Sequence, residues 1–149
     1  MTRKWLFDTS ILQEPASSLP NQKALVQSQD TAVATALASM QYLHLSSVIV
    51  TATGRNDSPV IGIFTERDVL HRVIDRCGDL SLLPLNDVMT EEPLVGTADS
   101  TLAWLLHCMS HKGMRHIPIV DAEKHPLYVI CVRDIVELLV ESFPPDAIG

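Results

Sequence analysis

Two stretches of this sequence, DTAVATALASM at residues 30–40 and DSTLAWLLHCM at residues 99–109, follow the same pattern at an offset of 69 residues. In both, apolar residues recur with the spacing i, i+3, i+4, i+7, which places them on one face of a helix. The aligned apolar positions are Val33 with Leu102, Ala36 with Leu105, Leu37 with Leu106, and Met40 with Met109. We expect Asp30, and Asp99 with Ser100, to cap these helices. The chain therefore contains an internal repeat on the scale of half its length.

The repeat continues beyond these two helices. Each helix is followed by two apolar runs with a turn-forming segment between them, as in a pair of strands. Each half then closes with a helix that begins near an Arg-Asp pair, Arg67-Asp68 or Arg133-Asp134. The expected strands lie at 24–28, 46–50 and 60–64 in the first half and at 93–97, 116–120 and 127–132 in the second. The sequence thus predicts a mixed α/β (α+β) fold built from two β-α-β-β-α repeats.

The two repeats are expected to share one core. A unit of about 50 residues buries too little surface to offset its chain entropy, so we predict sheet-to-sheet packing with pseudo-twofold symmetry. A crevice at such an internal interface is a common ligand site. The expected organisation is an N-terminal extension at 1–22, a first repeat at 23–79, a linker at 80–92, a second repeat at 93–142 and a C-terminal tail at 143–149. We expect at most a short packed turn in the extension, whose Trp5, Leu6 and Phe7 either pack on the body or belong to a loosely held arm.

The composition is that of a folded, acidic protein. With 46% hydrophobic residues among 149 the chain can form a core, and its formal net charge of −7 disfavours nucleic acid as a partner. Its three cysteines form no CxxC pair, which is typical of a reducing compartment. The N-terminus lacks the apolar run of about 7–15 residues of a secretory segment, and no run reaches the roughly 18 of a membrane span. We therefore expect a cytoplasmic protein without a nucleic-acid or membrane partner.

The sequence shows no catalytic apparatus. It contains no nucleophile elbow, Walker loop, dinucleotide-binding glycine motif or zinc-protease motif. Asp68 and Asp134 are equivalent positions of the two repeats and form no convincing acid/base pair. His107 and His111 stand four residues apart beside Cys108, a spacing that can hold zinc, but no third ligand is assured. We expect no enzyme activity, no required cofactor and no metal site.

Three segments of the chain resemble the tandem cystathionine-β-synthase (CBS) domain pair, a Bateman-type module. They are VIGIFTERDVLHRVID at 60–75, DVMTEEP at 87–93 and GMRHIPIVD at 113–121, and the resemblance covers roughly residues 22–142. It implies the β-α-β-β-α order of each repeat. It also implies clefts between repeats that bind adenosine-containing ligands: AMP, ADP, ATP, NAD-type nucleotides or S-adenosylmethionine. Two such pairs commonly form a flat dimeric disc, so the resemblance implies a homodimer.

In this family a hydroxyl residue three positions before an aspartate marks the ligand site. The first repeat has this motif as Thr65-Glu66-Arg67-Asp68. The resemblance implies that Asp68 accepts hydrogen bonds from the ribose hydroxyls and that Thr65 binds a phosphate oxygen. The same spacing is that of a capping box, in which both side chains only satisfy the helix end. Spacing alone favours the cap, and the resemblance favours the ribose contact.

The second repeat departs from this motif. Cys131 stands where the hydroxyl is expected, and cysteine is a weak donor, although Asp134 still matches the ribose carboxylate. The resemblance places Arg115 and His116 near phosphates, whereas these residues with Lys112 could equally form a solvated loop. In the first repeat the positions that match Arg115 and His116 are Ser46 and Ser47, which carry no charge. The two clefts are therefore expected to be unequal.

The predicted function is that of a stand-alone CBS-domain pair that binds an adenosine nucleotide in the cleft between its repeats and signals to an unidentified effector protein. One alternative is a ligand-free dimerisation scaffold, in which the motif survives as helix caps. A further alternative is a metal-linked or redox-linked module that uses the histidines and cysteines. The remaining predicted ligand contacts are Val48, Ile63 and Ile117, placed against the adenine, with Arg67, Thr97 and Pro118.

Overall fold

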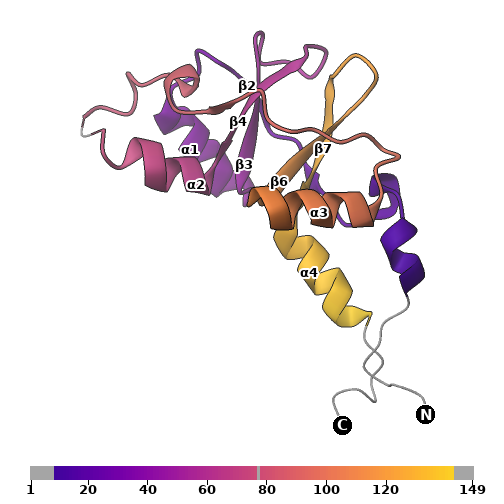
Figure 1. Cartoon of the computed structure of the whole chain (residues 1–149). Coiled ribbons are helices and arrows are strands. Elements are labelled where there is room, and N and C mark those ends of the chain that lie inside the picture. The colour runs from indigo at the N-terminus through magenta and orange to yellow at the C-terminus, as the bar shows by residue number, and fades with distance from the viewer. Residues whose placement is uncertain (1–8, 77, 143–149) are drawn as a thin grey trace, which may run out of the picture.

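The computed structural model describes residues 9–76 and 78–142. Trp5, Leu6, Phe7 and the tail at 143–149 lie outside these ranges, so the predictions made for them stay predictions. Figure 1 shows two units, each made of strands and helices, that meet along their strands. The predicted fold class, a mixed α/β arrangement of two repeats, is confirmed.

The first repeat has the predicted order of a short strand, a helix, a hairpin and a second helix. Its sheet has the order β2-β3-β4-β5, in which β2 runs parallel to β3 and the other neighbours are antiparallel. The second helix begins as an α-helix and continues as a π-helix, a form often found at functional sites. The elements are β2 (Val26–Ser28), α1 (Val33–Leu43), β3 (Ser47–Thr51), β4 (Val60–Thr65), α2 (Glu66–Asp68), the π-helix η3 (Val69–Val73) and β5 (Thr90–Glu91).

The second repeat differs mainly in its first strand. Its sheet has the order β1-β7-β6 with antiparallel neighbours, and the strand predicted at 93–97 is reduced to one parallel bridge between Gly96 and Ile119. The elements are β1 (Gln22–Lys23), α3 (Leu102–Lys112), β6 (His116–Val120), β7 (Pro126–Cys131) and α4 (Val132–Glu141). No helix among the described residues has the length and apolarity needed to cross a membrane.

The pseudo-twofold relation extends to local irregularities. The register of the β3–β4 hairpin shifts between Val50 and Thr51, and that of the β6–β7 hairpin shifts between Ile119 and Val120. These two pairs are separated by the same 69 residues as the helices. Both α1 and α3 also end at a residue in the left-handed conformation. The two halves therefore share backbone details that the apolar pattern alone does not specify.

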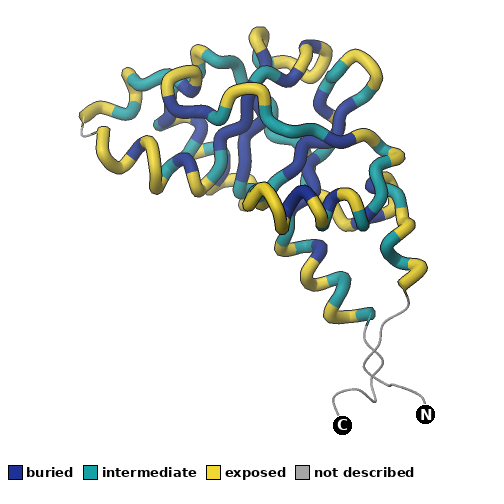
Figure 2. The backbone as a smooth tube through the Cα atoms, viewed as in Figure 1, coloured by how far each residue is buried: buried dark blue, intermediate teal, exposed yellow. Residues whose placement is uncertain are grey.

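Three apolar clusters stabilise the fold, and Figure 2 shows that buried residues concentrate along the central strands. One cluster lies under α1 and η3 around Phe64, and another lies under α3 and α4 around Ile130. The third joins residues from the strands of both repeats. Its buried members are Ile49, Val60, Ile63, Val120 and Val129. This third cluster is the shared core that two small repeats need, since burial of apolar area supplies most of their stability.

The helix caps predicted at Asp30 and Asp99 are wrong. Both helices begin later than expected, with Ala32 at the N-cap of α1 and Thr101 at the N-cap of α3. Thr101 accepts a hydrogen bond from the N–H of Trp104 at 3.2 Å, whereas the N-cap of α1 has no side-chain acceptor. The first N–H of α1 donates instead to a backbone carbonyl of the linker. A tertiary contact thus replaces the local cap.

The segment before the first repeat packs against the second repeat, more extensively than the short turn expected from the sequence. It forms two 3-10 helices, η1 (Thr9–Gln13) and η2 (Ala16–Ser18), and buries Ala16 and Leu19 in the second repeat's core. The N–H of Ala16 donates to the carbonyl of Ser100 at 2.7 Å, and β1 then pairs with β7. The linker does the same for the first repeat through η4 (Leu85–Asp87) and β5. Each connecting segment therefore completes a repeat.

Candidate functional site

A cavity of about 740 Å³ lies between the two repeats, and we call it the cleft. From the first repeat it is lined by the turn from β4 into α2, including Thr65 and Asp68. From the second repeat it is lined by the end of α3 and the loop into β6, including Lys112, Arg115 and His116. The fold therefore brings together two segments that the sequence analysis had singled out separately.

Asp68 is the most constrained side chain of the cleft. It is 5% exposed, and its Oδ2 accepts from the Thr65 N–H at 2.9 Å and lies 3.4 Å from the Thr65 hydroxyl. Its Oδ1 accepts from the hydroxyl of Thr90 at 3.0 Å and lies 3.7 Å from Nε of Arg72. The helix-capping arrangement is thus present. An ionised carboxylate offers about four acceptor positions, so Asp68 keeps capacity for a further donor.

His116 links the two repeats. Its Nε2 lies 2.7 Å from the hydroxyl of Ser46 in the first repeat and 3.7 Å from Sγ of Cys131 in the second. Burial lowers the pKa of His116 below its usual value, and the nearby Arg115 cation acts in the same direction against the neighbouring carboxylates. The neutral imidazole is therefore favoured in the folded protein, with one ring nitrogen engaged at the repeat interface.

Arg67 forms a second link between the repeats. Its Nη1 donates to the carbonyl of Gly113 at 3.2 Å, at the C-terminal end of α3. Both Arg67 and Gly113 line the cleft and are exposed to solvent. A ligand in the cleft therefore lies beside a hydrogen bond that joins the two repeats.

The equivalent motif of the second repeat lies outside the cleft. Asp134 is partly buried on α4, and its Oδ2 accepts from Nε2 of Gln22 at 3.3 Å. Cys131 occupies the N-cap of α4 and makes no capping hydrogen bond there. Gln22 on β1 thus holds Asp134 as Thr90 on β5 holds Asp68, in keeping with the pseudo-twofold relation.

The structure brings six of the eleven predicted ligand contacts into the cleft. These are Ile63, Thr65, Arg67, Asp68, Arg115 and His116. Val48 and Ile117 are instead fully buried in the cores under the helices, because their strand positions face the helices. Pro118 is buried within β6, and Thr97 is exposed, its N–H donating to the Ser100 hydroxyl. With Asp134 on α4, these five residues do not line the cleft.

Sequence reasoning missed four polar residues of the cleft, Glu66, His71, Arg72 and Thr90, of which the last two contact Asp68. Arg72 follows Asp68 by one helical turn, so the i, i+4 spacing was an available signal. Thr90 lies within the linker string DVMTEEP, which carried the resemblance but received no role. Its contact with Asp68 depends on the pairing of β5 with β4, which only the folded chain shows.

The cleft concentrates positive charge in an acidic protein. Four of the chain's 11 Lys and Arg residues line it, against two carboxylates. The four cations are Arg67, Arg72, Lys112 and Arg115, and the two carboxylates are Glu66 and Asp68. His71 and His116 add two titratable rings. A cavity with one buried carboxylate and several cations suits a ligand with hydroxyl groups at one end and negative charge at the other.

A family model for the CBS domain matches residues 18–75 and 85–141 of this chain. The chain belongs to the CBS-domain family. It is 26% identical over 125 residues to an uncharacterized 17.7 kDa protein of Acidianus ambivalens, covering 84% of this chain and 73% of that protein. It is 31% identical over 103 residues to the CBS domain-containing protein CBSCBSPB3 of Arabidopsis thaliana, covering 69% of this chain but only 18% of that protein.

Solved structures of CBS proteins have the same fold. An uncharacterized conserved protein from Pyrococcus horikoshii superposes with a TM-score of 0.73 at 24% identity, covering 85% of this chain and 92% of that one. The CBS domain pair of MJ0100, solved with 5'-methylthioadenosine and S-adenosyl-L-methionine, gives 0.72 at 13% identity, covering 85% and 96%. A hexameric CBS-CP12 protein from bloom-forming cyanobacteria gives 0.71 at 22% identity, covering 82% and 66%. At these identities the likeness establishes the fold alone.

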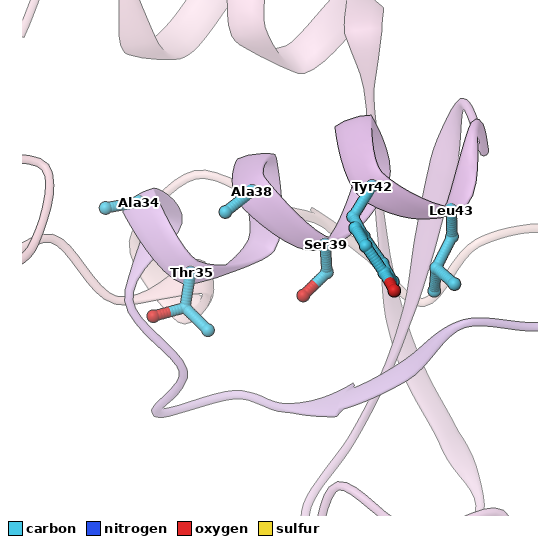
Figure 3. Close-up of a pocket in the computed structure, with 6 residues that line it drawn as sticks. All are labelled: Ala34, Thr35, Ala38, Ser39, Tyr42 and Leu43. Atoms are coloured by element: carbon cyan, nitrogen blue, oxygen red, sulfur yellow. The ribbon is translucent and has the colours of Figure 1, made fainter.

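The CBS pair has a second, shallower hollow on the outer side of α1, shown in Figure 3. Its volume is about 510 Å³, and small side chains line most of it. Tyr42, at 84% exposure, and Leu43 close one end. This hollow carries no titratable cluster and lies on the helix face opposite the core residues Val33, Ala36 and Met40.

The histidines considered as zinc ligands are arranged differently from a metal site. The rings of His107 and His111 stack with centroids 4.0 Å apart, and Nδ1 of His111 lies 3.0 Å from the carbonyl of His107. Within the described ranges, potential ligand atoms of three residues gather instead at Asp121, Glu123 and His125, within 4.8 Å of one another. Oδ1 of Asp121 accepts from the backbone N–H groups of the other two, so this cluster shapes the β6–β7 turn.

Proposed function

We propose that this CBS pair is a regulatory binding module rather than an enzyme, and that it binds an adenosine-containing nucleotide in the cleft. The observation that carries the proposal is the position of Asp68, a buried carboxylate, opposite Lys112 and Arg115 from the other repeat. In the proposed complex Asp68 accepts hydrogen bonds from the ribose hydroxyls. Arg115 and Lys112 bind the phosphates, and Ile63 packs against the base.

The proposed signal is a change in how the two repeats are held together. A ligand that contacts both repeats stabilises the arrangement it binds more tightly, and this shifts the population toward that arrangement. Two hydrogen bonds join the repeats at the cleft, one from Arg67 to Gly113 and one between His116 and Ser46. A bound ligand would therefore affect these two contacts first. An effector protein that contacts both repeats then distinguishes the occupied from the empty module.

The comparisons support this proposal at the level of the family. The CBS pair of MJ0100 was solved with two adenosine-containing ligands, 5'-methylthioadenosine and S-adenosyl-L-methionine. This chain spans only part of two plant relatives, 18% of CBSCBSPB3 and 55% of the mitochondrial CBSX3. The proposal therefore concerns nucleotide binding by the CBS pair and does not extend to the activities or partners of those longer proteins.

We also propose a homodimer formed through the helices. Large apolar side chains remain exposed on the helices of both repeats, away from the cores that the same helices cover. They include Tyr42 at 84% and, in the first repeat's second helix, Leu70 at 64%, which also lines the cleft, with Ile74 at 59% directly after that helix; in the second repeat they include Val136 at 50% and Val140 at 63%. Pairing two copies buries such faces, and the hexameric CBS-CP12 neighbour is an assembled protein of the same fold.

The ligand-free scaffold is the second candidate, and one observation favours it. The Thr65–Asp68 arrangement is a complete helix cap without any ligand. In that case the cations of the cleft have no ligand to bind and the exposed helices alone serve the function. For both candidates we propose a cytoplasmic location, which the free thiols of Cys108 and Cys131 support.

The experiment measures thermal unfolding of the full chain with AMP, ADP, ATP, NAD and S-adenosylmethionine. A ligand at about 100 times its Kd stabilises the folded state by roughly 2.7 kcal/mol. For a chain of this size that raises Tm by about 5–10 °C. Asp68→Asn should abolish the shift, because the amide replaces one carboxylate acceptor by a donor.

The matched control is Asp134→Asn, which changes the equivalent residue outside the cleft. Asp134→Asn should retain the shift. If none of the five compounds raises Tm of the wild-type chain, the nucleotide proposal fails and the scaffold is favoured.

A further inference from the structure

The two repeats provide an internal comparison for the cleft. In the β3–β4 hairpin Ser47 pairs with Thr65, and in the β6–β7 hairpin His116 pairs with Cys131. Each residue that lines the cleft therefore has a corresponding residue, its mate, in the other half of the repeat pattern, and we call this set of corresponding positions the mate cleft. The mates are fixed by strand register, so the two places can be compared residue by residue.

The mate cleft lacks most of the cations. Its positions hold Ser46 for Arg115, Leu43 for Lys112, Leu138 for Arg72 and Glu137 for His71. Arg67 is the only one of the four Lys or Arg residues whose mate is also a cation, Arg133. The cleft thus has four Lys or Arg against two carboxylates, whereas the mate cleft has one Arg against the two carboxylates of Asp134 and Glu137.

Side chains of the protein itself also occupy the polar positions of the mate cleft. The hydroxyl of Ser46, the mate of Arg115, is 2.7 Å from His116, and Cys131, the mate of Thr65, is 3.7 Å from the same nitrogen. Gln22 donates to Asp134. Ser46 and Cys131 are thus engaged with His116, whereas Asp134 accepts a hydrogen bond from Gln22 much as Asp68 accepts one from Thr90.

The cations of the cleft are available to an anion. Within residues 9–76 and 78–142, neither Lys112 nor Arg115 forms an ion pair with a carboxylate, and both are exposed. Arg72 interacts with Asp68 and with the carbonyl of Met89. Two unpaired cations from the second repeat beside a carboxylate from the first attract negative charge and repel positive charge.

We propose that the ligand of the cleft is a nucleotide with more than one phosphate, and that one such molecule binds per chain. This rests on the proposed function and narrows it. S-adenosylmethionine carries a sulfonium and an ammonium group, which the cations disfavour, whereas ATP and ADP place negative charge against Lys112 and Arg115. The mate cleft lacks the positive charge that a second phosphorylated nucleotide needs, and its Ser46 and Cys131 are engaged with His116.

The test is isothermal titration calorimetry of the full chain with ATP, AMP, adenosine and S-adenosylmethionine at one ionic strength. We expect one ATP per chain and an affinity for ATP about tenfold or more above those for AMP and S-adenosylmethionine. The double variant Lys112→Leu with Arg115→Ser installs the mate residues in the cleft. It should lower ATP affinity about tenfold or more and change adenosine affinity by less than about threefold. Both residues are exposed, so the variant should fold.

The control variant is Arg133→Ser, which removes the one cation of the mate cleft and should leave ATP binding unchanged. Two ATP per chain, tighter binding of S-adenosylmethionine than of ATP, or unchanged ATP affinity in the double variant would each overturn the inference. In those cases an adenosine compound still binds, so the proposed function survives. If adenosine and all three charged compounds fail to bind, the proposed function itself fails.

Discussion

The hydroxyl of Thr90 donates a hydrogen bond to Oδ1 of Asp68 at 3.0 Å, across a separation of 22 residues. The linker provides this contact, because β5 pairs with β4 and carries Thr90 over the start of α2. The same arrangement recurs in the second repeat, where Gln22 on β1 donates to Asp134 at 3.3 Å. Each motif aspartate is therefore oriented by the segment that leads into the other repeat.

Thr90→Val should weaken nucleotide binding, because it removes a donor that orients the Asp68 carboxylate while keeping the side-chain shape. Because the Thr90–Asp68 bond exists with and without ligand, only the loss of Asp68 orientation affects binding, and we expect a cost of about 0.5–1.5 kcal/mol, a roughly two- to tenfold decrease in affinity. Thr90→Ser retains the hydroxyl and should restore most of the affinity in calorimetry. Gln22→Leu removes the equivalent contact outside the cleft and should bind as the wild type does; equal weakening in both variants would contradict the assignment.

The stability of the fold should depend on pH through His116. Burial depresses the pKa of His116 in the folded chain, whereas the unfolded imidazole titrates at about 6.5. Below that pH the unfolded state binds more protons than the folded state, so the free energy of unfolding falls as pH falls toward the folded pKa. Above about 6.5 both states are neutral and this contribution is constant.

His116→Gln should therefore lose less stability than the wild type between pH 7.5 and 5.5. Urea unfolding at the two pH values measures the difference, and the remaining five histidines are common to both proteins. Parallel pH profiles for wild type and variant would show that burial of His116 has no such effect.

His44→Gly should stabilise the protein. His44 ends α1 with φ at 55°, in the left-handed conformation, whereas its mate at the end of α3 is Gly113 with φ at 68°. Glycine adopts this conformation without a Cβ penalty, so we expect a gain of about 0.5–1 kcal/mol.

The reciprocal change Gly113→Ala should cost about 1 kcal/mol. A Cβ at Gly113 meets no atom within 4 Å, so the backbone conformation alone causes that loss. Thermal unfolding of both variants tests the pair, and a destabilised His44→Gly would contradict it.

Leu19→Ala should destabilise the chain, although Leu19 lies in the N-terminal segment that precedes the first strand. Leu19 is 4% exposed in the core of the second repeat, and truncation of such a leucine costs about 2–5 kcal/mol. Leu82→Ala is the matched control, since Leu82 is 81% exposed and should change stability by less than about 0.5 kcal/mol. Equal unfolding free energies for the two variants would show that the N-terminal segment is only loosely attached.

Local patterns in the sequence predicted the order of elements well. The apolar stripes of α1 and α3 and the runs of the two hairpins depend on near neighbours, so their periods were visible without a structure. The helix caps at Asp30 and Asp99 were predicted wrongly, because the chain begins both helices later and uses a linker carbonyl in α1. The strand expected at 93–97 survives as one bridge at Gly96.

The candidate site was predictable where one short motif carries it. Thr65, Asp68, Arg115 and His116 were identified from two strings of the sequence, and the fold places all four in the cleft. Val48 and Ile117 were expected to contact a ligand, but they lie in the cores. The alternation of side chains along a strand does not reveal which face of the sheet the helices cover, so the sequence could not exclude these two residues.

The sequence by itself determined that this chain is a duplicated β-α-β-β-α unit, since hydrophobic period and repeat offset are properties of neighbouring residues. Only the tertiary structure decided which distant residues meet: Thr90 with Asp68, His116 with Ser46, and the N-terminal segment with the second core. These contacts join residues 22 or more positions apart, and their formation depends on how the two sheets pack. The sequence predicted two unequal clefts, and the tertiary structure decided that the cations of the second repeat lie beside the motif of the first.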